Sequence, residues 1–423
     1  MRWFLVFVLV FGCGRGGRRE ERAEERREQA KSEGRSKDVA REAPEDGTTA
    51  ALEALGYVSE GNEPLTAEVG VVKNLPGAWP GTNLLVSAHD FEVTLVDMAG
   101  EPLHTWKLRP ADHPNARSHS FRRAWVLPDG GLLGVVEGSR LMRLNTSGRV
   151  VWSSELTHHH DVHLVGDELH TLTREVRRVG ALRSKPSLED QITVLDLDGK
   201  VLRQTSVLKS LLRSDYDELI AEAKEEAVDL LHTNSLKLLD GRGAAANPAF
   251  AAGNYLVSCR RLSALMVIDP KQEKVIWAQK GPWRAQHDAQ ILDDGSLMVF
   301  DNGGNKESAT RIYDLATMEE RWKWAAGEGT DYHTDCCGTN IKLPNGNVLF
   351  VLTDQGAAWE VTPEGQPVWE YHTPHRVGVL QRKVHRLWDV VRMPPVAELP
   401  WFARLKSATP AVPTPDPEAP SPP

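Results

Sequence analysis

Three histidines stand at comparable places in this chain, each at the start of a run that alternates apolar and polar residues. They are His160, His232 and His287. Asn234 lies two residues after His232, so a strand would turn both side chains to the same face. Imidazoles and an amide, together with the guanidinium of Arg260, suit a group with several anionic oxygens. Arginine binds paired oxygens, asparagine donates a neutral hydrogen bond, and neutral histidine attacks or carries protons.

The spacing around His287 extends this set. His287 lies eight residues before the turn glycine Gly295, and the same offset in two other repeats leads to Arg122 and Gly338. Arg122 is therefore a candidate for substrate binding. Two more candidates near the same rim are Arg311, whose alternative is a surface ion pair, and His333, whose alternative is a solvated loop histidine.

No carboxylate is clearly expected on the histidine face. Asp161 and Asp288 each follow a histidine directly, so in a regular strand they point away from it. A single histidine at the start of a strand is more often structural than catalytic. The repeated position, with Asn234 and Arg260 fitting the same site, favours the functional interpretation.

The elements that must position these residues form repeats. Six copies of a four-stranded unit can be aligned, each with D-G or N-G type turns and most with a tryptophan in the last strand. Such copies, at roughly 30 to 50 residues each, are typical of a β-propeller, in which the first strand of every blade lines the channel. The sequence therefore predicts an all-β, six-bladed β-propeller that brings the histidines to one rim. The recurring tryptophans are expected to fill the space between blades: Trp106, Trp152, Trp277, Trp324 and Trp369.

Two segments have helical periodicity. Residues 208–231 alternate apolar and charged positions at helical spacing, which predicts an insertion between the third and fourth blades. Residues 379–391 read as a second amphipathic piece that packs against the outside of the last blade. His158 and His159 are expected to lie in a loop.

Both ends of the chain differ from its body. Residues 1–13 carry an early arginine and a short apolar run that ends at Cys13, which resembles a lipoprotein signal. Residues 14–66 are highly charged and predict a disordered tether, and residues 406–423 are rich in proline. The propeller body is expected over residues 67–405, with a helix near its C-terminal end.

These features predict an exported protein whose only membrane contact is a lipid on Cys13. Glycine rather than aspartate follows Cys13, so we expect the outer membrane, facing the periplasm or the exterior. The alternative is an ordinary secretory signal with an incidental cysteine. A net charge of −9 disfavours nucleic acid as a partner. Cys259, Cys336 and Cys337 cannot build a disulfide framework, although the adjacent pair leaves a vicinal disulfide as the alternative to free thiols.

Several pieces of the chain together resemble the bacterial arylsulfate sulfotransferases. They are HHD at 159–161, HTNS at 232–235, SCRRLS at 258–263, QHDAQILDDGSLMVFDNG at 286–303, and LPNGNVL with WEVTPEGQPVWEY in the last blade. The resemblance implies a six-bladed propeller that moves a sulfuryl group from an aryl sulfate to a phenol, without a nucleotide donor or another cofactor. It implies that His287 forms a sulfohistidine, that His232, Asn234 and Arg260 hold sulfuryl oxygens and assist proton transfer, and that His160 completes the pocket.

The chain departs from well-studied family members in two ways. A charged tether stands where they have an N-terminal β-domain, and no cysteine pair precedes His287. The acceptor range and the oligomeric state therefore stay open. Two other functions also remain: a non-catalytic propeller that binds a ligand or partner, and a metal-dependent lactonase or lyase in which the imidazoles hold a divalent cation.

Overall fold

A computed structural model describes residues 60–114, 118–178, 186–222, 228–303, 307–325 and 332–408. All of these belong to one compact unit, Gly47–Pro423. The leader with Cys13, the tether up to residue 59 and the tail from residue 409 lie outside the described residues. Within the described ranges, no helix is both long and apolar enough to cross a lipid bilayer.

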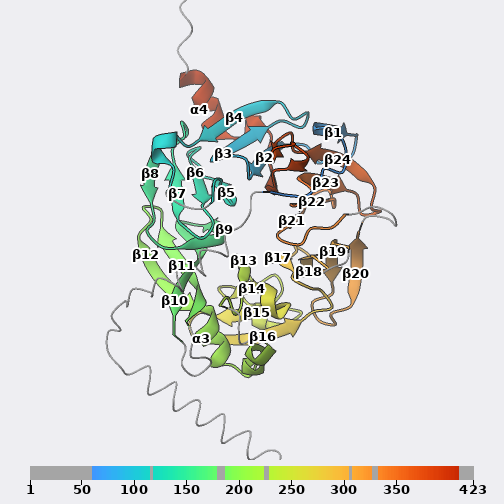
Figure 1. The fold of residues 1–423 in the computed structure, drawn as a ribbon. Coiled ribbons are helices and arrows are strands. Elements are labelled where there is room, and N and C mark those ends of the chain that lie inside the picture. Colours follow the sequence, from blue (N-terminus) through green and yellow to red (C-terminus); the bar gives the residue numbers. More distant parts are fainter. Residues whose placement is uncertain are drawn as a thin grey trace, which may run out of the picture. The chain divides into compact units, whose positions relative to one another are not determined.

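Six antiparallel sheets of four or five strands are arranged around a common axis, which confirms the predicted six-bladed propeller (Figure 1). Blades 2 to 5 each use four consecutive strands, with the first strand nearest the axis. Blade 2 has β5 (Arg123–Val126), β6 (Leu132–Val135), β7 (Leu141–Leu144) and β8 (Val150–Ser153). Blade 3 has β9 (His158–Val165), β10 (Glu168–Arg177), β11 (Ser187–Asp196) and β12 (Val201–Ser206). Blade 4 has β13 (Thr233–Leu238), β14 (Tyr255–Cys259), β15 (Ala264–Asp269) and β16 (Lys274–Lys280), and blade 5 has β17 (His287–Ile291), β18 (Leu297–Asp301), β19 (Ala309–Tyr313) and β20 (Glu320–Trp324).

The first and last blades combine strands from both ends of the chain. Blade 1 has β2 (Thr82–Ser87), β3 (Glu92–Val96) and β4 (Pro102–Lys107), and its inner strand is β27 (Leu387–Met393). Blade 6 has β21 (Thr339–Lys342), β22 (Val348–Leu352), β23 (Ala357–Val361) and β24 (Pro367–His372), with β1 (Gly70–Asn74) as a fifth, outer strand. The ring is thus closed by hydrogen bonds between segments about 300 residues apart.

This closure corrects the prediction for residues 379–391. They form no helix on the outside of the propeller; their C-terminal part begins β27, the inner strand of blade 1, and a small hairpin of β25 (Arg376–Val377) and β26 (Lys383–Val384) precedes it. The charged residues between the apolar ones belong to a strand whose two faces differ. The partner of this strand, β2, lies far away in sequence. Before the expected start of the propeller body at residue 67, the backbone of Gly61 donates to the carbonyl of Val384 at 2.8 Å.

The turn chemistry that revealed the repeats is present in the structure. Between β17 and β18, Gly295 N–H donates to the Leu292 carbonyl at 2.9 Å, and Leu292 N–H donates to the Ser296 carbonyl at 2.8 Å. Gly295 has a φ of +80°, a conformation that L side chains rarely adopt. The DDG sequence therefore determines both the turn and the register between β17 and β18, the strands on either side of it.

The recurring tryptophans link neighbouring blades. The indole N–H of Trp106 donates to the Gly130 carbonyl at 2.9 Å, and that of Trp369 donates to the Met98 carbonyl at 3.1 Å. Trp152 and Trp324 make equivalent bonds to the next blade. Large rings that fill the wedge between blades and donate one hydrogen bond confirm the structural interpretation of these residues.

The insertion between blades 3 and 4 is only partly α-helical. It contains α3 (Val207–Leu212) and a 3-10 helix, η2 (Asp217–Glu222), while residues 223–227 lie outside the described part. Its apolar residues join the core between these two blades. The C-terminal helix α4 (Pro400–Ala408) packs Trp401 against Trp106, with ring centroids 5.5 Å apart. Four further 3-10 helices are described: η1 (Pro110–Asp112), η3 (Pro248–Phe250), η4 (Arg260–Leu262) and η5 (Val396–Glu398).

Candidate active site

The inner strands β9, β13 and β17 all begin irregularly, and this irregularity orients the histidines. The strand register shifts within the first residues of each. His160 and His232 have φ values of +55° and +51°, and Asp288, next to His287, has +42°. Residues other than glycine seldom occupy this region, so the surrounding structure must hold them there. Such strain is common at functional sites.

At His160 and His287, the bulges separate the imidazole from the aspartate that follows it. Asp161 accepts a hydrogen bond from Leu236 N–H at 3.0 Å, and Asp288 accepts one from Asn340 N–H at 2.9 Å. Both bonds reach the inner strand of the next blade. The two residues of each His-Asp pair therefore have different roles. The imidazole belongs to the site, and the carboxylate links neighbouring blades.

The three histidines gather with Arg122 and Arg260 in a buried site that we name the chamber. The rings of His160 and His232 lie 5.1 Å apart and almost perpendicular. His160 and His287 are 1% and 2% exposed. Burial lowers the pKa of His287 well below its usual value, and the nearby positive charge of Arg260, then those of Arg122 and His232, lower it further. The structure thus brings together residues from blades 2, 3, 4 and 5.

The hydrogen bonds of His287 define its tautomer. Nδ1 lies 2.7 Å from Oδ1 of Asn302, and the Asn302 amide nitrogen donates to the carbonyls of Thr334 and Cys337. Because that assignment leaves Asn302 Oδ1 as an acceptor, Nδ1 of His287 carries the proton. Nε2 then carries the lone pair, and it accepts from Cys337 N–H at 3.2 Å. His287 is therefore a neutral imidazole whose lone pair is on Nε2.

The backbone N–H at Nε2 comes from a tightly placed loop before β21. Cys337 has a φ of +70° and Gly338 a φ of +91°. A Cβ on Gly338 would lie 2.2 Å from the Phe300 ring, so only glycine allows this close approach. Cys336 and Cys337 are free thiols, with their sulfurs 2.8 Å apart.

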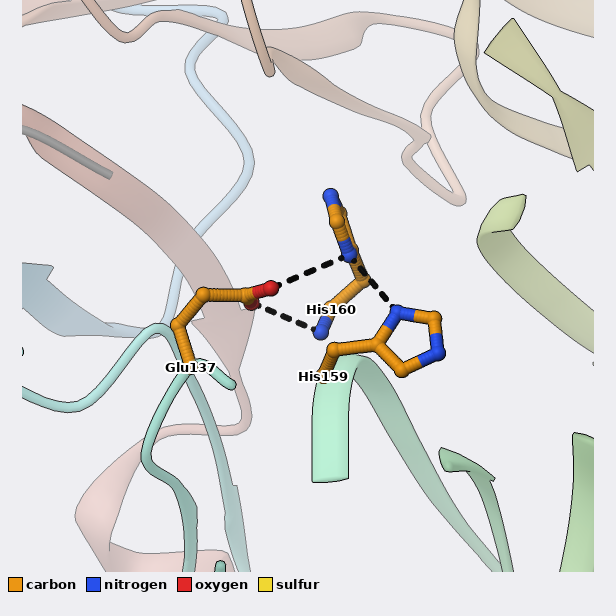
Figure 2. Close-up of side chains that lie close together, drawn as sticks. All are labelled: Glu137, His159 and His160. Atoms are coloured by element: carbon orange, nitrogen blue, oxygen red, sulfur yellow. Dashed lines mark hydrogen bonds and ion pairs between the residues drawn. The ribbon is translucent and has the colours of Figure 1, made fainter. Parts of the chain in front are cut away.

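Two of the imidazoles have a carboxylate partner. His232 Nδ1 lies 2.6 Å from Asp229 Oδ2, and the backbone N–H of His232 donates to Asp229 Oδ1 at 2.9 Å. Burial raises the pKa of Asp229, but the charge of His232 and the bond from it more than offset this, so the net shift is downward. His160 Nδ1 lies 3.4 Å from Glu137 Oε1, and its backbone N–H donates to Glu137 Oε2 at 2.9 Å. Figure 2 shows this second pair with the neighbouring ring of His159.

Arg122 supplies an unpaired buried charge. It is 3% exposed, and among the described residues its Nε and Nη1 have no hydrogen-bond partner. Its guanidinium lies 4.7 Å from the Trp388 ring centroid. A buried guanidinium without an anion is costly, which distinguishes Arg122 from an arginine held in a structural ion pair.

Asn234 and His333 lie at the margin of the chamber, and Arg260 contacts the loop that carries His333. Asn234 donates to the Gln286 carbonyl at 2.8 Å, directly before His287, while its Oδ1 is buried without a partner among the described residues. Arg260 donates to the Asp335 carbonyl at 3.0 Å, and His333 Nε2 lies 2.7 Å from Asp335 Oδ1. His333 is half-buried, and it lies on the loop that also carries Cys337.

Arg311 is the exception. Its guanidinium contacts Asp301 Oδ2 at 2.8 Å and Glu320 Oε2 at 2.5 Å, within blade 5. These carboxylates use its donors, so the expected role in substrate binding is not supported and the ion pair is the correct interpretation. The expectation of a loop at His158 and His159 is also wrong, because both are buried in β9. Apolar and polar residues do not alternate regularly in β9, so the sequence pattern did not indicate a strand at His158 and His159.

Within the described chain, Glu137, His159 and His160 are the one group whose donor atoms lie close enough to hold a metal ion (Figure 2). Their surroundings do not favour it. Arg174 Nη2 lies 2.8 Å from His159 Nδ1, where it donates to the lone pair that a metal would need. Burial and the neighbouring histidines lower the pKa of His160, and the positive charges of Arg122 and Arg174 lower it further. The same positive charges would repel a divalent cation.

A second buried polar group, which we name the channel cluster, lies further along the same inner strands. Arg123 Nη1 contacts Asp389 Oδ2 at 2.5 Å, and its Nε lies 3.5 Å from Asp161 Oδ1. Lys237 Nζ contacts Asp288 Oδ1 at 3.0 Å and lies 4.0 Å from Asp161 Oδ2. Four of these residues, Arg123, Lys237, Asp288 and Asp389, line a cavity of about 120 Å³. Every charge in the channel cluster has an opposite charge beside it.

The fold and the site define a six-bladed β-propeller with a buried chamber of imidazole and guanidinium groups where its inner strands begin. Residues 123–374 match the family described as arylsulfotransferase (ASST). This match covers more than half of the 423 residues. The chain therefore belongs to the arylsulfotransferase family.

Other comparisons concern the fold. A Bacteroides caccae protein of unknown function has 13% sequence identity and a TM-score of 0.44, with 69% of this chain and 93% of that chain covered. The WD40 β-propeller domain of Doa1 has 12% identity and a TM-score of 0.44, covering 79% and 91%. Virginiamycin B lyase from Staphylococcus aureus has 10% identity and a TM-score of 0.40, covering 73% and 90%. No curated protein matches the sequence significantly, and we draw no conclusion about activity from likenesses this distant.

Proposed function

We propose that this protein transfers a sulfuryl group from an aryl sulfate ester to a phenol, in two steps through a sulfohistidine on His287, without a nucleotide donor or another cofactor. Family membership supports sulfuryl transfer in general. The observation that carries the finer proposal is the tautomer of His287, whose Nε2 lone pair lies in a chamber with an unpaired guanidinium.

In the first step, the Nε2 lone pair forms a bond to sulfur and the sulfur–oxygen bond to the aryl group breaks. The proton stays on Nδ1 in its hydrogen bond to Asn302 Oδ1, so the ring becomes a cationic imidazolium when Nε2 bonds to sulfur. This keeps the nitrogen a good leaving group for the second step, in which the acceptor phenol attacks sulfur and Nε2 regains its electron pair. Asn302 therefore matters because it prevents the loss of that proton.

The sulfuryl oxygens need donors as the bond changes proceed. Arg122 is the best placed, because two of its buried nitrogens are unused among the described residues. Arg260 and Asn234 lie beside His287, and the Cys337 N–H that now contacts Nε2 could turn to a sulfuryl oxygen once Nε2 is bonded. Such preorganised donors stabilise charge that develops in the transition state.

The test is transfer from 4-nitrophenyl sulfate to phenol by the purified protein, followed as release of 4-nitrophenol and formation of phenyl sulfate. We expect turnover without any added nucleotide sulfate donor and loss of turnover in His287→Ala. Turnover that survives this substitution would reject His287 as the nucleophile. A protein that binds the donor but never releases 4-nitrophenol would favour the non-catalytic binding propeller.

The metal-dependent alternative has a separate test. Elemental analysis of the purified protein, together with turnover after treatment with a chelator, distinguishes it from the proposed reaction. We expect unchanged transfer after chelation, because the proposed steps use only the chain's own donors and acceptors. Loss of turnover that returns with a divalent cation would support the metal-dependent function.

We further propose that the protein is exported and anchored by a lipid on Cys13, at an outer membrane. Support comes from the leader sequence alone. Labelling with palmitate in cells should mark the parent protein and fail for Cys13→Ala. An unlabelled parent would leave a simple secretory signal as the explanation.

A further inference from the structure

The chamber contains two carboxylate–imidazole pairs, and they are not equivalent. In the first pair, Asp229 contacts both the ring and the backbone of His232, at 2.6 Å and 2.9 Å. In the second pair, Glu137 lies 3.4 Å from the ring of His160 and bonds mainly to its backbone, at 2.9 Å. The shorter ring contact belongs to the imidazole with the more exposed side chain, since His232 is 14% exposed and His160 only 1%.

The two rings also differ in the charges that surround them. His160 faces His232, His159, Arg122 and Arg174, and its pKa is lowered well below the usual value by burial and then by these groups. His232 faces the same His160, together with His287 and His159, but it has the Asp229 carboxylate in direct contact. A buried positive charge needs a counter-ion, and the carboxylate lies 2.6 Å from the ring of His232 but 3.4 Å from the ring of His160.

We propose that Asp229 positions His232 as the acid and base of the transfer reaction, whereas His160 stays neutral and only donates or accepts hydrogen bonds. This inference rests on the proposed function and assigns its proton transfers. The Nδ1–H of His232 donates to Asp229, so the opposite ring nitrogen, Nε2, is the atom that exchanges protons with substrate. Asp229 is a positioning residue, because it acts through His232.

The proton balance closes over the two steps. As the sulfur–oxygen bond of the donor breaks, its electron pair goes to the aryl oxygen and the Nε2 proton of His232 moves to that oxygen, which releases a neutral phenol. His232 is then neutral. As the acceptor phenol attacks sulfur, its hydroxyl proton returns to Nε2, and the bond between sulfur and His287 breaks with its pair returning to His287. His232 ends protonated, as it began.

The leaving group of the donor provides a specific test in the full-length protein. 4-Nitrophenolate is stable without a proton, whereas phenolate needs one as it departs, so loss of a general acid affects phenyl sulfate most. For Asp229→Asn we expect the single-turnover rate of phenol release to fall about 10²- to 10³-fold with phenyl sulfate and less than about 10-fold with 4-nitrophenyl sulfate.

Glu137→Gln is the matched control. It removes the other carboxylate and should lower the rate with both donors by a similar factor. If Asp229→Asn does not fold, His232→Gln carries the same test, since its amide can still donate to Asp229. Equal losses with both donors in Asp229→Asn, or a loss that depends on the leaving group in Glu137→Gln instead, would overturn this inference alone. A parent protein that releases no phenol from either donor contradicts the proposed function, and this inference falls with it.

Discussion

Arg122 and Arg123 are neighbours in sequence, yet they belong to two buried regions that treat charge in opposite ways. Arg123 lies in the channel cluster, between Asp389 and Asp161. Arg122 lies in the chamber, where two of its nitrogens have no partner among the described residues. Successive strand residues point to opposite sides, so one step along the chain moves a guanidinium from one region to the other.

The difference bears on the proposed function, because buried polar groups that serve the fold should be paired within it, whereas groups that bind a ligand should not. In the channel cluster, each carboxylate links inner strands of different blades and each cation neutralises carboxylates, so the region is complete without a ligand. In the chamber, the carboxylates Glu137 and Asp229 contact the imidazoles, and Arg122 remains unneutralised. A region that is incomplete without an anion is the expected form of an anion-binding site.

The largest effect should come from breaking the channel cluster. Arg123→Met leaves Asp389 and Asp161 buried beside an apolar side chain, and loss of one partner of a buried ion pair costs about 3–5 kcal/mol. Urea unfolding should show this loss in the free energy of unfolding. The double variant Arg123→Met with Asp389→Leu should recover part of it, because it also removes one of the stranded charges. A loss as small as that of an exposed ion pair would show that the cluster does not hold the blades together.

Arg122→Met should have the opposite effect: activity should fall while the free energy of unfolding is kept. We expect kcat/KM for aryl sulfate to fall about 10²- to 10³-fold, since a donor to the developing charge is lost. The free energy of unfolding should stay the same or rise, because an unpaired buried charge is removed. Arg122→Lys keeps the charge and should retain more activity. If Arg122→Met is instead unstable and fully active, Arg122 belongs to the fold and the contrast with Arg123 disappears.

Mild acid should affect the chamber before the channel cluster. The pKa values of His160 and His287 are lowered by burial, so below the ordinary histidine pKa the unfolded chain binds protons that the folded protein does not. Stability is then lost as the pH falls through that ordinary value, by about 1.4 kcal/mol per pH unit for each such group. The pKa of Asp161 is also lowered, since His163, Lys237 and Arg123 outweigh the effect of burial, so its contribution persists until much lower pH.

Thermal unfolding across this pH range checks the prediction. The melting temperature should decline from neutral towards mildly acidic pH in the parent protein, and less steeply in His160→Gln. A melting temperature that stays constant until the pH reaches the range in which carboxylates titrate would contradict the lowered pKa values of the histidines.

Arg311 provides the smallest effect and a control for the other arginines. It is paired with Asp301 and Glu320, but its side chain is 22% exposed. Arg311→Met should cost about 1 kcal/mol or less and leave transfer unchanged. A large loss of activity would return Arg311 to the site and weaken the contrast between paired and unpaired guanidinium groups.

The sequence predicted the blades and the strand openings because both depend on local signals, the turn glycines and the alternation of residues. His160, His232, His287 and Arg122 could be placed near one another from those signals alone. The β27 closure could not be predicted, because its partner β2 is about 300 residues away and only the closed ring pairs them. Asp229 stands three residues before His232, a turn spacing that could have identified it, whereas Glu137 and Asn302 reach their histidines from other strands or loops.

The bulges explain the remaining differences. Strict alternation along β13 placed Asn234 beside His232, but the register shift after Thr233 directs its amide nitrogen to the Gln286 carbonyl. A shift of one residue changes which face every following side chain occupies. Such shifts depend on contacts between blades, which a single repeat does not reveal.

The central claim is that Nε2 of His287 carries the sulfuryl group between donor and acceptor. Incubation with 4-nitrophenyl sulfate but no phenol, followed by an alkaline quench and peptide mass spectrometry, tests it directly. We predict the added mass of one SO₃ group on His287, lost again when phenol is supplied before the quench. An enzyme that turns over with His287 unmodified, or with the group on another residue, would contradict the account.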